Sequence, residues 1–165
     1  MSTSRSVMSA AILANERGDG VRRPRSRTKA IASLLAEVPL FAGLSSRHLR
    51  RIASLADDRR YPAGRPIVQI GGRGDAFYVI VDGRAKVTMG GSRSIARLEA
   101  GDFFGELAVL DGGTRTASVI AETPVSTLRI ARTDLRKVLR QEPDVAMKLL
   151  EEVAGRLRSR SSPTQ

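Results

Sequence analysis

The densest group of residues that could do chemistry lies within residues 101–119. Gly105 allows a tight backbone turn and a close approach to a ligand. Residues 106–110 form a short, helix-compatible apolar run whose first amides would favour an anion. Arg115 follows Glu106 by nine residues, after flexible glycines. A guanidinium brought to that turn would cradle a phosphate, and Glu106 would then have to face another group, such as a ribose hydroxyl.

The composition argues against catalysis. The chain has no cysteine, which excludes disulfides, thiolate metal sites, iron–sulfur clusters and a cysteine nucleophile. His48 is the single histidine and falls on a helix outside the strands, whereas a cupin-type enzyme needs about three metal ligands inside its roll. We therefore expect no enzyme, no metal site and no cofactor.

The net charge of +11 is concentrated at the two ends of the chain. Residues 1–29 carry a net charge of +5 and residues 156–165 a net charge of +3, which leaves +3 for the body. A DNA-reading face on the folded domain is thus not favoured, although such tails can still hold polyanions. No stretch reaches the roughly 20 apolar residues of a membrane span. Residues 7–14 are at the low end of the length of a signal-peptide core and lack a clear cleavage site, so we expect a cytoplasmic protein.

A chain of 165 residues is long enough for one domain with a core and too short for two. We expect a disordered basic tail over 1–28, one domain over 29–160 and a short tail over 161–165. Capping residues at 26–28 predict a first helix, which Pro39 ends, and Ser45 precedes a second.

Hydrophobic residues alternate with a period of two from about residue 68 to 89, which predicts strands. Further short strands are predicted at 95–98, 117–121 and 125–130. Glycine-rich turns separate them, and Asp82-Gly83 predicts a hairpin with a type I′ turn. Phe41, Phe77 and Tyr78 are expected in the core.

The helical period returns after residue 130. Thr133 is expected to cap one helix, and Pro143 suits the first turn of the last one. Ala146, Leu150, Val153 and Leu157 form an apolar stripe that we expect to pack on the strands, with a dimer seam as the alternative. The fold class is α+β: an antiparallel, jelly-roll-like β-roll flanked by N-terminal and C-terminal helices.

The segment around Glu106 resembles the phosphate-binding cassette of the cyclic-nucleotide-binding domain family, which catabolite-activator-type regulators, protein-kinase regulatory subunits and gated channels share. Phe104-Gly105-Glu106-Leu107-Ala108 is followed at the family's spacing by Arg115 and Thr116. The resemblance continues through residues 38–45, 61–64, 72–80 and 82–83, so it covers about 29–160 in order.

By resemblance, Gly105 and Leu107 contribute backbone contacts, Glu106 takes the ribose 2′-hydroxyl and Arg115 pairs with the cyclic phosphate. Ala108 and Thr116 would line the same pocket. In family members the last helix folds over the base. Arg156 and Arg160 are the candidate lid residues here, with Arg160 favoured by its place near the end.

Two positions depart from the commonest pattern. Thr114 stands where the family often has proline, which should loosen the loop slightly. Thr116 stands where cAMP sites often have alanine, and its hydroxyl can reach either the phosphate or a guanine amino group. The base, cAMP or cGMP, stays open at this position.

The expected function is that of a stand-alone sensor that binds cAMP, favoured over cGMP, and acts on an unknown effector protein. The alternative is a ligand-free scaffold of the same fold that mediates protein interactions. The family's DNA-binding regulators carry a winged helix-turn-helix after the last helix, whereas this sequence ends at Gln165, so we expect no sequence-specific DNA binding. Homodimerisation is a further expectation.

Overall fold

The computed structural model describes residues 25–161, with side chains as far as Ser159. Two α-helices and a short 3-10 helix come first: α2 (Arg25–Ala36), η1 (Pro39–Phe41) and α3 (Ser46–Leu55). Ser45 caps α3 as predicted, because its side chain accepts a hydrogen bond from the His48 backbone N–H at 3.3 Å. Helix α2 begins at Arg25, just before the capping residues that the sequence suggested, and ends before Pro39.

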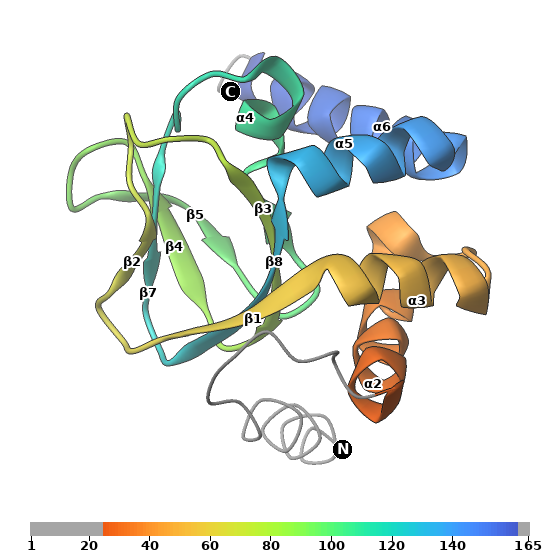
Figure 1. The fold of residues 1–165 in the computed structure, drawn as a ribbon. Helices are drawn as coiled ribbons and strands as arrows, with labels where there is room; N and C mark the ends of the chain where they lie inside the picture. Colours follow the sequence, from red (N-terminus) through yellow and green to blue (C-terminus); the bar gives the residue numbers. More distant parts are fainter. Residues whose placement is uncertain (1–24, 162–165) are drawn as a thin grey trace.

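Eight strands form two four-stranded antiparallel sheets that together make the roll (Figure 1). The first sheet has the order β1 (Ala56–Tyr61), β8 (Val125–Ala131), β3 (Ala76–Asp82) and β6 (Phe103–Phe104). The second has the order β2 (Pro66–Val68), β7 (Ser118–Ala121), β4 (Ala85–Thr88) and β5 (Ser94–Leu98). The predicted α+β fold with an antiparallel β-roll is confirmed.

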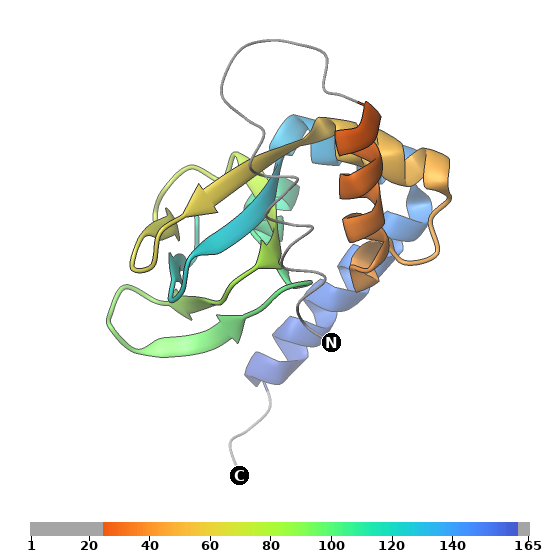
Figure 2. The ribbon, with the colours of Figure 1, turned by 90° about the horizontal axis from the view of Figure 1, so that it is seen from below.

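Three helices complete the fold: α4 (Glu106–Asp111), α5 (Arg132–Gln141) and α6 (Pro143–Ser161). Pro143 stands at the first turn of α6 as predicted, where its missing N–H leaves no helical bond unmade. Seen from below, α6 runs alongside the roll (Figure 2). No helix within residues 25–161 is long and apolar enough to cross a membrane.

Strand β3 serves two hydrophobic cores because its side chains alternate between the faces of its sheet. Phe77 and Val79 pack against the helices, in a core that includes Ile31, Leu35, Phe41 and Leu149. Ala76, Tyr78 and Ile80 point the other way, into the space between the two sheets. The prediction that Phe41, Phe77 and Tyr78 are core residues is confirmed.

The predicted hairpin at Asp82-Gly83 is wrong. Gly83 does adopt a positive φ of 91°, but β3 and β4 belong to different sheets and do not pair. A Cβ at Gly83 would lie 2.2 Å from the carbonyl oxygen of Pro124. Gly83 thus lies at the corner where the chain passes from one sheet to the other, and the Pro124 backbone leaves no room for a side chain there. The hairpin forms one turn later, where β4 pairs with β5 across Gly90 and Gly91.

Two predictions about the C-terminal helices are also wrong. Helix α5 begins at Arg132, so Thr133 lies inside it and does not cap it. In α6 the most deeply buried apolar side chains are Val145 and Leu149, whereas Leu150 and Leu157 are 55% and 58% exposed. The buried face of α6 is therefore displaced by about one residue from the predicted stripe. The helix carries apolar residues on two adjacent faces, and the sequence pattern alone does not show which of the two is buried.

Candidate ligand-binding site

Gly105 forms the turn between β6 and α4. Its φ is +88°, in the left-handed region, and it takes the N-cap position of α4. A Cβ there would lie 2.5 Å from Nη1 of Arg115 and 2.9 Å from the carbonyl oxygen of Ala76. Both the backbone conformation and the close approach of Arg115 therefore require glycine.

Arg115 is buried, with 5% of its surface exposed. Its guanidinium donates to the carbonyl oxygen of Ala76 at 2.7 Å and to that of Gly105 at 3.4 Å. The closest carboxylate is Asp75, 3.8 Å from Nη2, on a side chain that is 64% exposed. Nε of Arg115 is buried and makes no hydrogen bond to any residue between 25 and 161.

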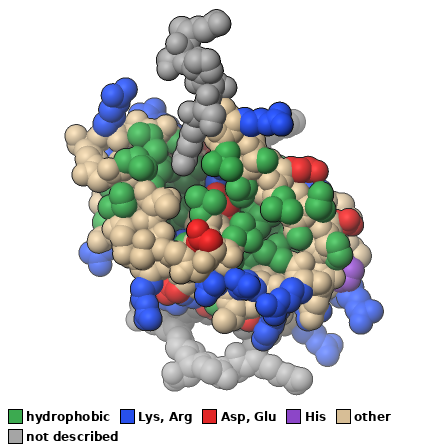
Figure 3. Space-filling model, turned by 90° about the horizontal axis from the view of Figure 1, so that it is seen from above, with side chains coloured by type: hydrophobic (Ala, Val, Ile, Leu, Met, Phe, Trp, Pro, Cys, Tyr) green, Lys and Arg blue, Asp and Glu red, His purple; other side chains and the backbone are tan. Residues whose placement is uncertain are grey.

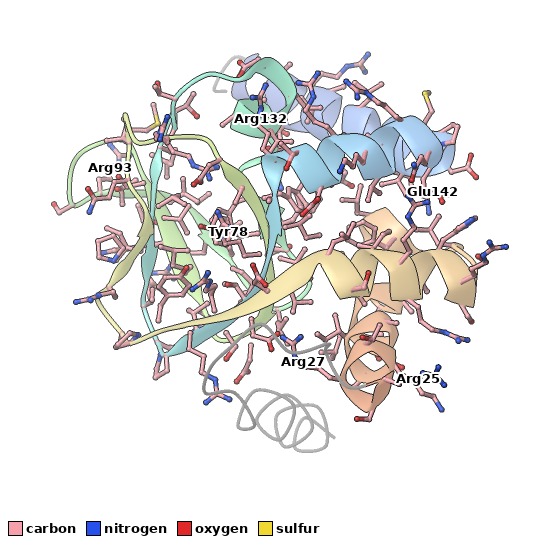
Figure 4. The ribbon with its side chains drawn as sticks, in the orientation of Figure 1. Arg25, Arg27, Tyr78, Arg93, Arg132 and Glu142 are labelled. Carbon is pink, nitrogen blue, oxygen red and sulfur yellow. The ribbon has the colours of Figure 1, made fainter. Side chains whose placement is uncertain are left out.

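The environment of Arg115 leaves its charge poorly compensated. Burial lowers the pKa of the guanidinium below its ordinary value, and Tyr78 and Asp75 oppose that effect. Figure 4 shows Tyr78 in the interior of the roll, and its ring centroid lies 5.8 Å from Cζ of Arg115. A buried cation that is held by carbonyls and one distant carboxylate is a strong attractor for an anion.

The backbone around Arg115 is fixed by the loop before β3. Its N–H donates to the carbonyl of Gly72 at 2.9 Å, and its carbonyl accepts from the N–H of Gly71 at 2.8 Å. The two glycines in this pairing belong to the turn that the sequence marks at residues 71–75. The arginine is thus held from both its backbone and its side chain before any ligand arrives.

Glu106, the first residue of α4, is also buried, with 5% exposed. Its Oε1 accepts a hydrogen bond from Nη1 of Arg156 at 2.6 Å. Arg156 reaches it from α6, donates to the carbonyl of Phe103 at 3.0 Å and lies over the Phe103 ring at 4.6 Å. Oε2 of Glu106 makes no hydrogen bond to the described part of the chain.

These side chains surround a cavity of about 630 Å³ between the roll and α6. All six residues that the sequence proposed as ligand contacts line it: Gly105, Glu106, Leu107, Ala108, Arg115 and Thr116. Of the two candidate lid residues, Arg156 lines the cavity too. Arg160 belongs to α6, but its side chain lies outside the described residues.

Sequence reasoning missed the remaining walls of the cavity. The roll contributes aliphatic side chains, and α6 contributes two carboxylates and a hydroxyl: Val68, Val87, Leu98, Glu151, Glu152 and Ser159. The α6 residues follow a helical spacing, because Glu152 and Ser159 share one face of the helix with Arg156. The sequence would have indicated these residues only if this face of α6, and not the leucine stripe, had been expected to pack on the roll.

The far end of α4 is held by α5. Nε of Arg132 donates to the carbonyl of Val109 at 3.1 Å, and Nη1 of Arg136 donates to that of Leu110 at 3.4 Å. The N–H of Gly112 closes the helix on Ala108 at 2.9 Å. Carbonyls at a helix C-terminus lack partners within the helix and carry partial negative charge, so two arginines suit them. Figure 4 shows Arg132 close to α4.

The site has no features of a metal centre. Within residues 25–161 no group of three or more His, Cys, Asp or Glu side chains is placed to hold a metal ion.

A family model described as the cyclic nucleotide-binding domain matches residues 58–142. The cAMP-dependent protein kinase regulatory subunit of Aspergillus fumigatus is 39% identical over 123 residues, which are 72% of this chain and 29% of that protein. The cGMP-dependent protein kinase egl-4 of Caenorhabditis briggsae is 38% identical over 119 residues, which are 68% of this chain and 16% of that protein. The crystal structure of the Thermus thermophilus catabolite activator protein has a TM-score of 0.67 and 37% identity, and the match covers 73% of this chain and 59% of that one. The chain thus spans less than a third of the two kinase-related proteins.

Proposed function

The chain belongs to the cyclic nucleotide-binding domain family, and from that premise we propose that it is a sensor that binds cAMP in preference to cGMP. The observation that carries the proposal is Arg115, whose buried Nε has no hydrogen-bond partner in the described part of the chain and whose side chain lines a cavity of about 630 Å³. A cyclic phosphate in that cavity provides an anionic partner for the buried guanidinium of Arg115. The hydrogen bonds between them are charge-assisted.

The ribose is assigned to Glu106. Its Oε1 is already occupied by Arg156, and Oε2 makes no hydrogen bond to a described residue, so one carboxylate oxygen is available to a 2′-hydroxyl. Arg156 thereby fixes the orientation of Glu106. Phosphate and ribose contacts then come from Arg115 and Glu106, which stand at opposite ends of the 105–115 segment.

The base is assigned to the space between the roll and α6. We assign the lid to Arg156, because its side chain lines the cavity. Its guanidinium already stacks on Phe103, so it can offer its second face or its edge to a purine. The preference for cAMP rests on the similarity to the fungal cAMP-dependent subunit, and Thr116 leaves room for cGMP.

The sensor is proposed to act on a partner through a ligand-dependent change in α6, without catalysis of its own. A second copy of the chain is one such partner. Met147 and Leu150 are 56% and 55% exposed on the outer face of α6, and Ala154 continues the heptad spacing. Seen from above, the molecule has hydrophobic side chains gathered around a hollow in its surface (Figure 3). Sedimentation of the chain and of a Leu150→Glu variant checks this: a dimer that the variant abolishes supports the seam.

The decisive experiment is calorimetry with cAMP, cGMP and linear 5′-AMP titrated side by side into the full chain. The proposal expects saturable binding of cAMP, weaker binding of cGMP and the weakest binding of 5′-AMP, which lacks the cyclic phosphate. Absence of binding by all three nucleotides favours the alternative function, a ligand-free scaffold that mediates protein contacts. Tighter binding of cGMP than of cAMP overturns the base preference alone.

A further inference from the structure

A second cavity, of about 310 Å³, lies on the other side of the first sheet from the candidate site. The end of α2 and the start of η1 form one wall, and β3, β8 and the turn before β6 form the other. It shares no lining residue with the ligand cavity. Its floor is aliphatic: Leu35, Val38, Val79, Val81 and Leu128.

The mouth of this cavity is acidic. Glu37 and Asp102 line it and are exposed, and Glu99, also exposed, donates its N–H to the Asp102 carboxylate at 2.7 Å. A cavity with an apolar floor and carboxylates at its mouth fits an apolar segment that is followed or preceded by basic residues. An apolar engineered cavity of about half this volume is large enough for benzene, so this one has room for two or three aliphatic side chains.

We propose that residues 7–14 of the same chain dock in this cavity. The segment contains Val7, Met8, Ile12 and Leu13 and no charged residue, within a 29-residue stretch whose net charge is +5. Arg22 and Arg23 connect it to α2 and match the acidic mouth in sign. Among sources of an apolar group, this segment is the one tethered next to the cavity, and tethering raises its effective concentration to about the millimolar range.

The tether has the required length. From Arg25 to the cavity wall at Leu34 is about 14 Å along α2, at 1.5 Å per residue. Residues 15–24 span at most about 33 Å when extended. For comparison, a flexible chain of ten residues has a root-mean-square end-to-end distance of about 18 Å, which is close to the distance needed. The segment therefore reaches the cavity without unwinding α2.

A disulfide-trapping experiment tests the docking in the full chain, which has no cysteine of its own. The pair Leu13→Cys and Ala100→Cys joins the segment to the mouth of the cavity. The control pair, Leu13→Cys and Ala63→Cys, joins it to an equally exposed alanine that does not line the cavity. Docking predicts at least tenfold higher effective molarity for the first pair, with the product running as a monomer. Equal yields, or a product that is a cross-linked dimer, overturn the proposal.

Amide exchange gives a second measurement that needs no cross-link. The N–H of Gly101 donates to the Ile80 carbonyl and that of Ile80 donates to the Asp102 carbonyl, both at 2.8 Å, beside the cavity. In the full chain, the double variant Ile12→Asp with Leu13→Asp should speed exchange at these amides about fivefold or more. The control Ser2→Asp with Ser4→Asp adds the same charge and should leave them unchanged. Wild-type rates in the first variant overturn the docking, whatever the outcome of the nucleotide titrations.

Discussion

Arg115 is buried, lines the cavity and has an Nε that no residue within 25–161 hydrogen-bonds. Replacing it with alanine should weaken cAMP binding by about 30-fold or more, because removing one partner of a desolvated charge pair costs about 2–5 kcal/mol. Arg115→Lys should restore binding only partly, since an ammonium cannot form the bidentate pair. Calorimetry measures both. Arg93→Ala removes the same charge from an exposed loop position and should bind like the wild type. Unchanged affinity in Arg115→Ala would contradict the phosphate assignment.

Glu106 has one carboxylate oxygen on Arg156 and one that we assign to the ribose. Glu106→Gln should weaken cAMP binding by about 1–2 kcal/mol, because the amide keeps an oxygen but loses the charge. The same variant should lose much less affinity for 2′-deoxy-cAMP, which has no hydroxyl to offer. Titration of both nucleotides into both proteins gives the comparison. An equal loss for the two ligands would show that Glu106 acts only through Arg156.

The cavity residues between Gly105 and Thr116 could be predicted from sequence, because glycine, glutamate and arginine at this spacing have few other uses together. All six proposed contact residues do line one cavity. Apart from Arg156, the α6 contributions, Glu152 and Ser159 among them, could not be predicted, since they depend on how far the helix is rotated about its own axis. That rotation follows from packing against α5 and the roll, which local sequence does not report.

The orientation of helix α6 can be tested directly, because one of two adjacent leucines is buried and the other is exposed. Leu149 is 1% exposed and Leu150 is 55% exposed. Leu149→Ala should reduce the free energy of unfolding by about 2–5 kcal/mol, as expected for a buried leucine. Leu150→Ala should stay within about 0.5 kcal/mol in the monomer. Urea unfolding of the two variants measures the difference. A larger loss for Leu150→Ala would mean that the predicted leucine stripe, and not the Val145–Leu149 face, packs on the protein.

The contact between α4 and α5 predicts a loss of stability when Arg132 is replaced. Arg132→Met removes the donor to the Val109 carbonyl and a cation from the C-terminus of α4. We expect a loss of about 1 kcal/mol of stability, or about 3 °C in Tm, from these two contributions. Binding of cAMP should also weaken, because α4 carries Glu106 and Ala108 into the site. Arg140→Met, on the exposed side of the same helix, is the matched control for thermal melting and calorimetry.

The strands show which elements sequence patterns can predict. Alternating apolar residues located β3 and β4 within one or two residues, because each has a face in a core. Strand β1 has the sequence ADDRRY, in which four of six residues are charged, so periodicity alone gave no signal over residues 56–58. It is a strand because β8 pairs with it from Ala56 to Tyr61. The two-residue β6 likewise depends on its partner β3.

For the whole molecule, the proposed switch connects the cavity to α6. Saturating cAMP should slow amide exchange in residues 150–159, since the ligand would fill the space between this helix and the roll. Amides of residues 31–35 in α2, which line no part of the ligand cavity, serve as an internal control. Hydrogen-exchange mass spectrometry reports both segments in one experiment. Equal exchange in α6 with and without cAMP would place the response elsewhere, in the 105–115 segment or the N-terminal helices.

The pairing of β1 with β8 also has a consequence for how the chain folds. Thr127 of β8 donates to the carbonyl of Arg59 in β1, and these residues are 68 positions apart. At a synthesis rate of about 5–20 residues per second, β1 therefore waits several seconds on the ribosome for its partner. Contacts of such long sequence separation also slow folding in free solution. The charged sequence of β1 is well suited to that interval, because aspartates and arginines keep an unpaired strand soluble until the roll closes.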